Sequence, residues 1–220
     1  MLNRRNRSEE PSGRPDSVNS ALESTLTLQD GTVMQGTAFG ALNAAAGEVV
    51  FNTGMVGYPE TLTDPSYTGQ VLVMTYPLVG NYGVPANRTL DGLDLHFESD
   101  RIQIAGLIVS EVAENHNHWN AAKSLHQWLK TQGIPAISGI DTRSLTKRLR
   151  EKGSALGTIA SNGSRIDFYD PNRDNLVARV SIAEPVVYEK GKKRVILVDC
   201  GCKNNIIRSL LQRDVTVIRV

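Results

Sequence analysis

The chain has little of what would place it in a specialised class of protein. It contains only two cysteines among 220 residues, which cannot form a disulfide framework, and this favours a reducing intracellular compartment. No apolar run approaches the roughly 18–20 residues that a helix needs to cross a bilayer. Lys and Arg total 24 against 23 Asp and Glu, so a net charge of +1 gives no argument for nucleic acid or an anionic membrane as a partner.

Side-chain groupings typical of a catalytic or metal site are also missing. Cys200 and Cys202 occur as Asp-Cys-Gly-Cys-Lys, without the spacing of a metal or redox pair and without the Gly-x-Cys-x-Gly context of an amidotransferase nucleophile. His116 and His118 have no carboxylate or thiolate at a spacing that would complete a zinc site. No phosphate-binding glycine motif of the Walker type occurs. We therefore expect no catalytic residue and no metal ligand in this chain.

Residues 1–24 are polar, contain Pro, Gly and Ser, and have almost no large apolar side chains. Such a segment cannot bury enough surface to offset its ordering entropy, so we expect a disordered tail. Its four arginines suggest an organelle transit peptide, whereas its four acidic residues and the lack of an amphipathic period argue against one. A cytoplasmic location is the expectation, with the mitochondrion as the alternative.

Hydrophobic spacing predicts that residues 25–180 form one domain of mixed α/β class. A hairpin is indicated around Asp30 and Gly31, because apolar residues alternate on both sides of this turn. Helical spacing of apolar residues, counting Trp119 among them, predicts a helix over 119–132. Further strands are predicted at 48–53, 70–76, 102–109, 134–138 and 157–161.

A second helix is predicted over 142–152, with Asp141 as its N-cap and Gly153 at its end. Cations near its carboxyl end favour the helix dipole, so a solvated, stabilising face is a sufficient explanation for its basic character. Docking on an acidic patch of a partner domain is the alternative. The five cations are Arg143, Lys147, Arg148, Arg150 and Lys152.

Residues 181–193 are extended and charged and contain Pro185 and Gly191, which is typical of an interdomain linker. Residues 194–220 then have the pattern of a strand, a helix and a strand, the opening β-α-β unit of a parallel sheet. Parallel strands need cover on both faces, which so short a segment cannot supply. We therefore expect the chain to stop inside a domain, as a fragment of a longer protein.

The stretch 47–83, GEVVFNTGMVGYPETLTDPSYTGQVLVMTYPLVGNYG, concentrates backbone-constraining residues between two strand candidates. Glycine supplies positive φ or close backbone approach, and proline fixes φ and removes a donor. A loop over 54–69 with many such residues either holds a defined shape against something else or is an ordered structural connection.

FNTGMVGYPETLTDPSY in this stretch resembles the signature of the amino-terminal domain of the carbamoyl phosphate synthetase small (glutaminase) subunit. The similarity continues through TYPLVGNYG, GIPAISGIDTRSLTKRLREKG and VDCGCKNNIIRSLLQR, and the similar region runs from residue 26 to residue 220. MVGYPETLTDPSY and HNHWNAAKSLHQWL are more similar to the fused eukaryotic synthetases than to many free-standing bacterial subunits.

The resemblance implies a β/β/α layered domain over 25–180 and, over 194–220, the first β-α-β of a class I glutamine amidotransferase domain. It implies part of an enzyme, a glutamine-hydrolysing carbamoyl phosphate synthetase, which supplies ammonia from glutamine to be joined to bicarbonate for pyrimidine or arginine biosynthesis. The family's cysteine nucleophile, histidine and glutamate would lie beyond Val220. The expected partner is the large subunit or a fused synthetase domain, which would hold magnesium and ATP.

Gly54 is the one substrate contact that the resemblance carries over. In this family the residue after Phe-Asn-Thr lies at the boundary with the glutaminase domain, and in many bacterial members it is a serine that touches bound glutamine. A glycine leaves only a backbone contact to glutamine. The alternative is a glycine that the turn itself requires.

Two other functions stay open. One is the corresponding region of the ammonia-dependent animal synthetase, which lacks the nucleophile and in which this region is structural or regulatory. The residue in the downstream nucleophile turn would separate it from the glutamine-dependent enzyme. The other is a stand-alone interaction module without enzymatic context, which a continuation of the gene past Val220 would eliminate.

Overall fold

The computed structural model describes residues 22–220. The disordered tail expected over 1–24 lies outside the described residues up to position 21, whereas Glu23 and Ser24 already belong to strand β1 (Glu23–Leu28). Within the described part of the chain, none of the helices has the length and apolar character needed to cross a membrane.

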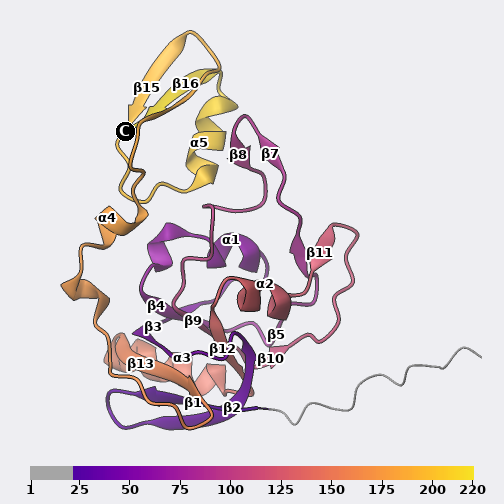
Figure 1. Ribbon diagram of the computed structural model, residues 1–220, viewed down its shortest axis with the longest axis vertical. Coiled ribbons are helices and arrows are strands. Elements are labelled where there is room, and N and C mark those ends of the chain that lie inside the picture. The colour runs from indigo at the N-terminus through magenta and orange to yellow at the C-terminus, as the bar shows by residue number, and fades with distance from the viewer. Residues whose placement is uncertain (1–21) are drawn as a thin grey trace, which may run out of the picture.

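Seven strands close into a barrel, drawn in the lower part of Figure 1. The four strands β3, β4, β9 and β12 pair in parallel, in that order, and β1 pairs antiparallel with β2 and β13. The mixed α/β class is confirmed, and the seven strands hydrogen-bond into one closed ring. The barrel strands after β1 are β2 (Val33–Gly40), β3 (Ala45–Asn52), β4 (Gln70–Met74), β9 (Gly106–Ile108), β12 (Pro135–Ser138) and β13 (Ala155–Ser161).

The strand expected over 102–109 enters the barrel only with the three residues of β9. Ahead of it, Gln103 N donates to the Leu62 carbonyl and Ala105 N donates to the Gln70 carbonyl, both at 2.8 Å, so this extended segment is held by a helix end and a strand start. The remaining short strands pair outside the barrel: β5 (Leu78–Val79) with β10 (Glu111–Val112), β6 (Val84–Pro85) with β11 (Ala121–Lys123), and β7 (Thr89–Leu90) with β8 (Leu93–Asp94).

The barrel wall separates two hydrophobic clusters, because successive side chains of a strand point to opposite faces. In β4, Val71 and Val73 are buried in a cluster to which all seven barrel strands contribute and into which Leu145 of helix α3 (Thr142–Lys152) packs. Leu72 and Met74 belong to the second cluster, outside the barrel, which helices α1 (Tyr58–Leu62) and α2 (Leu125–Thr131) cover.

The helix expected over 119–132 is shorter than predicted. Ser124 begins α2 with a capping box, the residues ahead of it form strand β11, and the Trp119 side chain is 86% exposed. Counting Trp119 as a core residue was wrong, because serine followed three residues later by glutamine is the stronger signal for a helix start. Gly133, with a φ of +71°, follows the helix end in the left-handed conformation that favours glycine.

The helix expected over 142–152 is confirmed as α3, with the Asp141 carboxylate accepting a hydrogen bond from Ser144 N at 2.9 Å and Gly153 at its end. The segment over 54–69, expected to be a loop, contains two short helical turns. These are α1 and the 3₁₀ turn η1 (Pro65–Tyr67), and each has proline in its first turn, where the missing N–H needs no partner.

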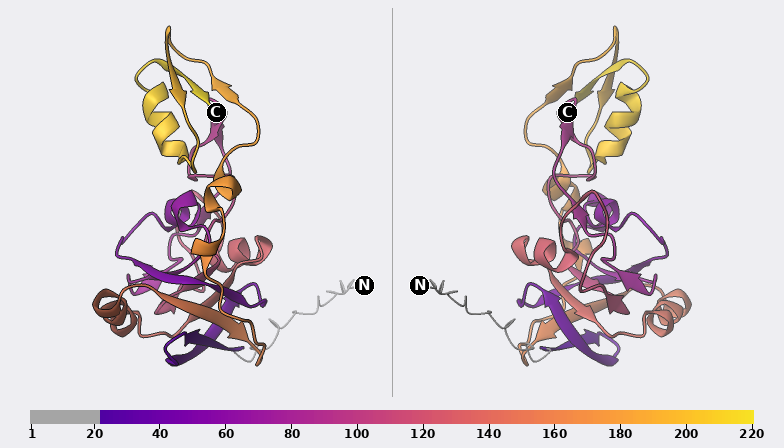
Figure 2. Two further views of the ribbon diagram at one scale, coloured as in Figure 1. Left: turned by 90° about the vertical axis from the view of Figure 1, so that its left-hand side faces the viewer. Right: turned by 90° about the vertical axis from the view of Figure 1, so that its right-hand side faces the viewer.

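A smaller carboxyl-terminal unit stands above the barrel domain in Figures 1 and 2. Strand β15 (Lys193–Leu197), helix α5 (Asn204–Leu211) and strand β16 (Val215–Arg219) confirm the expected β-α-β unit, because the two strands pair in parallel. The linker expected over 181–193 is only partly correct. Within it, β14 (Val186–Tyr188) pairs antiparallel with β16 as a third strand. The turn η2 (Pro171–Arg173) and helix α4 (Leu176–Val180) lead from the barrel to this unit.

One face of this three-stranded sheet is covered and the other is bare. Ile207 and Leu211 of α5 are buried against Val217 on the covered face. On the bare face, Ile196 of β15 is 68% exposed, and Val198, which follows β15, is 72% exposed.

Candidate functional site

The 53–57 loop joins β3 to α1 and carries the one site residue expected from the sequence. Its Met55 and Val56 side chains are 71% and 77% exposed, although both are apolar. Thr53 lines one hollow of the surface, and Val56 lines another. The loop is therefore well placed to contact another surface.

Gly54 lies exposed in this loop, and a neighbouring side chain limits what could replace it. Its N–H donates to Asn52 Oδ1 at 2.6 Å, and Asn52 Nδ2 donates to the Tyr67 hydroxyl at 3.0 Å. A Cβ atom on Gly54 would lie 2.9 Å from the same Asn52 oxygen. Gly54 is not among the glycines with positive φ, so the turn does not require glycine by its backbone angle.

The end of the loop is held firmly by two tyrosines. The Tyr82 hydroxyl accepts hydrogen bonds from Gly57 N at 2.8 Å and Tyr58 N at 3.1 Å, and the two rings stack with their centroids 4.3 Å apart. The Tyr58 hydroxyl donates to the Gly83 carbonyl. Burial raises the pKa of both tyrosines, so both phenols stay neutral and keep these hydrogen bonds.

A groove of about 1100 Å³ lies at the carboxyl ends of the four parallel strands, and we call it the α3 groove. Thr53 follows β3, Thr75 follows β4, Ser110 follows β9 and Asp141 follows β12, and all four line it together with α3. In α/β proteins, ligands commonly bind beyond the carboxyl ends of parallel strands.

A second hollow, of about 350 Å³, is lined by Val56 together with Tyr82, His96 and His118. His118 Nδ1 accepts a hydrogen bond from Asn120 N at 3.2 Å, so it lies in a turn ahead of β11 and outside helix α2. Within residues 22–220, no three His, Cys, Asp or Glu side chains are placed to hold a metal ion.

The two cysteines lie at the turn after β15, as residues that follow a strand. Cys200 is exposed and Cys202 is half-buried. Burial raises the pKa of the Cys202 thiol, which disfavours the thiolate that a nucleophile requires.

Asp199 organises this turn, although it was not among the residues predicted from the sequence. Its carboxylate accepts hydrogen bonds from Cys202 N (2.7 Å), Gly201 N (3.0 Å) and Ile182 N (2.7 Å), and it lies 2.8 Å from Arg219 Nη2. Burial alone would raise its pKa, but these hydrogen bonds and Arg219 outweigh burial and hold the pKa below its ordinary value. An aspartate directly before a glycine-containing turn was the signal that could have found it.

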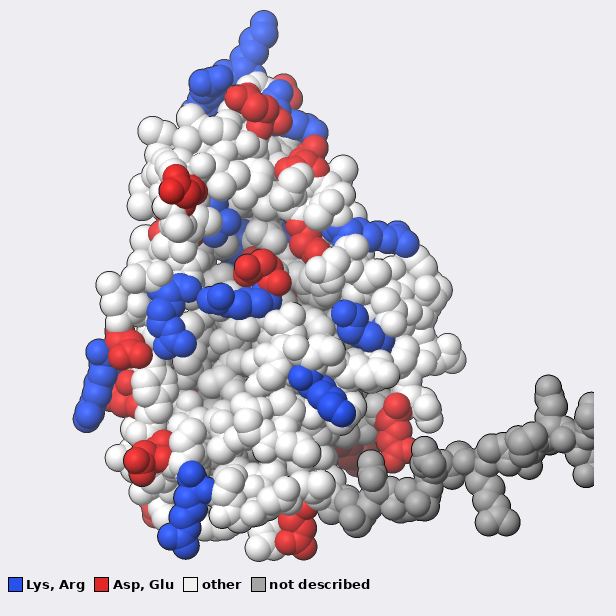
Figure 3. Space-filling view, in the orientation of Figure 1, with Lys and Arg blue, Asp and Glu red and all other residues white. Residues whose placement is uncertain are grey.

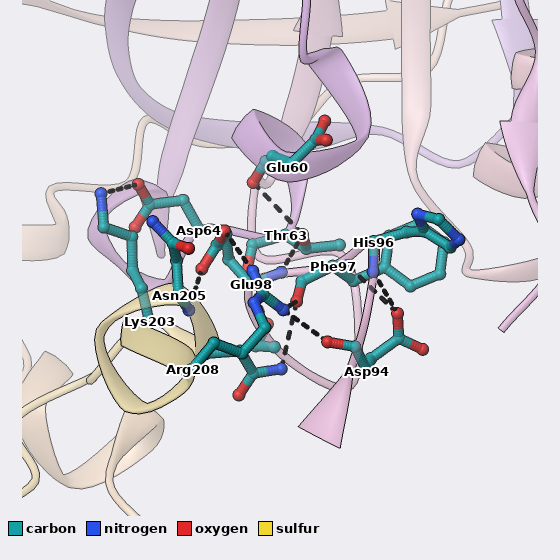
Figure 4. Close-up of polar contacts among 12 residues, drawn as sticks. Glu60, Thr63, Asp64, Asp94, His96, Phe97, Glu98, Lys203, Asn205 and Arg208 are labelled. Carbon is teal, nitrogen blue, oxygen red and sulfur yellow. Dashed lines mark hydrogen bonds and ion pairs between the residues drawn. The ribbon is translucent and has the colours of Figure 1, made fainter. Parts of the chain in front are cut away.

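Glu98 joins the carboxyl-terminal unit to the barrel domain (Figure 4). Its Oε1 lies 2.9 Å from Arg208 Nη2, and its Oε2 accepts a hydrogen bond from Asn205 N at 2.8 Å. On the barrel side, Glu98 N donates to Thr63 Oγ1 at 2.9 Å. We call these contacts the Glu98 junction. No local pattern around Glu98 marks it, because its partners in the carboxyl-terminal unit lie more than 100 residues away in the sequence.

Other contacts extend the Glu98 junction. Lys203 Nζ lies 3.2 Å from Asp64 Oδ2, and Arg208 Nη1 also donates to the carbonyls of Asp94 and Phe97. The β7–β8 hairpin lies beside α5 in Figure 1, and its Leu93 is buried in the same cluster as α5. The two units are therefore joined by polar and apolar contacts. On the face drawn in Figure 3, acidic and basic groups are interspersed, in keeping with the balanced charge.

Comparisons with known proteins give one consistent family. The family model described as carbamoyl-phosphate synthase small chain, CPSase domain, matches residues 26–159, which include most of the barrel. The carbamoyl phosphate synthase arginine-specific small chain of Neurospora crassa is 52% identical over 204 residues, 89% of this chain and 45% of that protein.

Two longer relatives are similar to the same extent. The human carbamoyl-phosphate synthase [ammonia], mitochondrial, is 50% identical over 195 residues, 87% of this chain and 13% of that protein. The multifunctional protein CAD of Squalus acanthias is 52% identical over 198 residues, 88% of this chain and 9% of that protein. The chain thus spans less than half the length of each of these relatives.

Proposed function

The chain belongs to the carbamoyl-phosphate synthase small chain family, and we propose that it forms the first, non-catalytic domain of the glutaminase part of a carbamoyl phosphate synthetase. The observation that carries the proposal is the family match over 26–159, which runs from within β1 to within β13. Relatives 50% to 52% identical over 87% to 89% of the chain support its extension into the carboxyl-terminal unit.

In such an enzyme a cysteine thiolate attacks the glutamine carboxamide, and the released ammonia is joined to bicarbonate with ATP by a synthetase subunit or domain. This chain would contribute shape rather than chemistry. The 53–57 loop, held by Tyr82 at its end, presents the exposed backbone of Gly54, which we assign to one wall of the glutamine cleft. Magnesium and ATP would be held by the synthetase partner.

We assign the carboxyl-terminal unit to the start of a class I glutamine amidotransferase domain. The parallel pair β15–β16 with α5 on one face supports the assignment, since such domains are built from parallel sheets covered on both faces. The bare apolar face at Ile196 and Val198 is what a further layer of such a domain would cover. The finer description of the barrel as a β/β/α layered domain belongs to the same proposal.

The relatives differ in pathway and in compartment, because one is named as an arginine-specific chain and another as a mitochondrial enzyme. We propose carbamoyl phosphate synthesis for pyrimidines or arginine, in the cytoplasm. The acidic residues within 1–24, which a transit peptide avoids, support the cytoplasmic location.

The ammonia-dependent enzyme is the second candidate, because a relative named for ammonia is as similar as the arginine-specific chain. There this domain would have no glutamine cleft to complete. The residue at the nucleophile position of the amidotransferase domain separates the two candidates.

Gly54→Val in the full-length enzyme that contains this chain tests the proposal. The added side chain would press on Asn52 Oδ1, which accepts the Gly54 N–H, and would stand beside the backbone that we assign to the glutamine cleft. We expect the KM for glutamine to rise at least about tenfold, equivalent to about 1.4 kcal/mol. The reaction with free ammonia should be unchanged, because ammonia does not use the glutamine cleft.

Met55→Val is the matched control, because it places the same side chain on an exposed neighbour in the same loop. It should leave both reactions within about twofold of the original enzyme. Equal loss of both reactions in Gly54→Val would show that Gly54 is structural. An enzyme that uses ammonia but never glutamine would identify the second candidate.

A further inference from the structure

The side chains of helix α3 point in three directions: into the barrel cluster, toward Asp30 and into the α3 groove. Leu145 and Leu149 are buried in the barrel cluster. Arg148 turns to Asp30, with Nε at 3.0 Å and Nη2 at 2.7 Å from Oδ2, and Lys152 Nζ lies 3.5 Å from the same oxygen. Two of the five cations of α3 are therefore paired with Asp30.

The other three cations, Arg143, Lys147 and Arg150, line the α3 groove. Their spacing of four and three residues places them on one face of the helix. Within residues 22–220, Arg143 and Arg150 have no acidic group within ion-pair distance, and Lys147 lies 3.9 Å from Glu151 with both side chains well exposed. We call these three residues the cationic stripe. Figure 2 shows α3 on the outside of the barrel, away from the carboxyl-terminal unit.

Hydroxyl groups face the cationic stripe across the groove and on the helix itself. Thr53 and Ser110 line the strand side, and Ser144 and Thr146 line the helix side. Thr146 Oγ1 is buried and has no hydrogen-bond partner among the described residues. A helical threonine usually bonds to a carbonyl one turn earlier, which this hydroxyl does not do, and its burial keeps it from an occupant of the groove.

Two carboxylates also line the groove and reduce its positive charge. Asp141 is already engaged, because it caps α3 through Ser144 N. Glu151 is the loose partner of Lys147. Three cations against two acids leave a positive balance, to which the amino-terminal end of α3 adds its partial positive charge.

We propose that the α3 groove is a docking site for an acidic polypeptide segment of a partner protein. From Arg143 to Arg150 the stripe is about 10 Å long at 1.5 Å per residue. A single phosphate or carboxylate is much shorter, whereas carboxylates on alternate residues of an extended chain are spaced about 7 Å apart and meet successive cations. Each exposed ion pair contributes only about 0.2–1 kcal/mol, so an occupant must make several at once.

The inference goes beyond the proposed function and is independent of the enzyme reaction, so its test uses the 220-residue chain and a deca-glutamate peptide carrying a fluorophore. Binding is measured by anisotropy at about 50 mM and about 300 mM salt, because screening weakens contacts between exposed charges. The groove variant is Arg143→Glu/Arg150→Glu. The matched control is Lys130→Glu/Lys192→Glu, which makes the same change in net charge at exposed cations outside the groove.

We expect the chain to bind the peptide at low salt, the groove variant to bind at least tenfold more weakly, and the control to stay within twofold. Amide signals of residues 141–151 should shift when the peptide binds to the original chain, which tests the site without any variant. Equal losses of affinity in both variants, or amide shifts spread over the whole surface, would show that net charge alone causes the binding. Either result would overturn the proposal. Absence of binding would overturn it too. Competition by inorganic phosphate at the concentration of the peptide would define a small-anion site instead.

Discussion

Arg208 of α5 and Glu98 of the barrel domain lie 2.9 Å apart between Nη2 and Oε1, and their side chains are 17% and 10% exposed. The Arg148–Asp30 pair has a similar distance of 2.7 Å, but its side chains are 36% and 33% exposed. Water screens the second pair and hardly reaches the first. The two pairs therefore differ in what the loss of one partner does.

We expect Glu98→Gln to lower the free energy of unfolding by about 3 kcal/mol, because it leaves the Arg208 guanidinium buried without its counter-charge. Urea unfolding followed by circular dichroism measures the change. The double variant Glu98→Met/Arg208→Met should recover much of the loss, because well-packed apolar side chains can replace a buried pair. A double variant less stable than Glu98→Gln would contradict this explanation.

Asp30→Asn removes one carboxylate in the same way and should cost much less stability than Glu98→Gln, because water screens the exposed pair. The hydrogen bond from the Thr32 hydroxyl is the largest cause that lowers the pKa of Asp30, and the hydrogen bond from Arg148 is the next. The carboxylate is therefore charged at neutral pH in the original chain. Its partial exposure nevertheless makes the pair weak. The same urea measurement serves as the comparison, and a loss as large as that of Glu98→Gln would show that exposure does not govern these pairs.

The stability of the carboxyl-terminal unit should fall in acid because of Asp199. Burial raises its pKa, but hydrogen bonds from Cys202 and Ile182 and the Arg219 charge outweigh burial, so the folded-state pKa lies below 3.8. The unfolded chain then binds more protons just below about pH 4, and the stabilisation is lost as the pH falls through the folded-state pKa. Unfolding measured from pH 7 to pH 3 should show this drop in the original chain. Asp199→Asn should be less stable at pH 7 and should lack the part of the drop that Asp199 causes.

The two tryptophans give a direct check of where α2 begins. Trp128 is 4% exposed and Trp119 is 86% exposed. Trp128→Ala should cost about 3–5 kcal/mol by leaving a cavity, whereas Trp119→Ala should stay within about 0.5 kcal/mol. A large loss of stability for Trp119→Ala would instead support the longer helix that the sequence predicts.

Local signals in the sequence were sufficient for elements that carry their own ends. Helix α3 has an N-cap at Asp141 and a closing glycine at Gly153, and β4 is an unbroken apolar run, so both were predicted nearly to the residue. Closure of the barrel was not predictable in this way, because it depends on pairings such as that of β1 with β13, in which Leu26 pairs with Ile159. Strand β14 was missed because charged neighbours hid its short run of β-forming residues.

The candidate site was predicted in the same uneven way. Gly54 stays a prediction from the family resemblance, and the atom that an added side chain would meet there, Asn52 Oδ1, is visible only in the folded loop. The basic character of α3 was plain from the sequence. Its division into Arg148 and Lys152 bound to Asp30, and three cations at the groove, depends on a contact across 118 residues.

The carboxyl-terminal unit should exchange its amide hydrogens faster than the barrel. Strands β14 and β15 are both edges of a three-stranded sheet with one bare apolar face, whereas β4 lies between two barrel neighbours and its residues Val71, Leu72 and Val73 are fully buried. Opening the smaller unit exposes less apolar surface, so its local free energy of opening should be lower. A difference of about 3 kcal/mol corresponds to roughly a hundredfold in exchange rate.

Hydrogen exchange measured by mass spectrometry on the 220-residue chain tests this expectation by comparing peptides that cover 193–219 with peptides that cover 70–74. Glu98→Gln should accelerate exchange more in the first set than in the second, because Glu98 contacts α5 directly, whereas β4 is reached only through unfolding of the whole chain. Exchange as slow in β15 and β16 as in β4 would mean that the three strands and α5 form a self-sufficient domain. The assignment of this unit to the start of a larger parallel sheet would then lose its physical support.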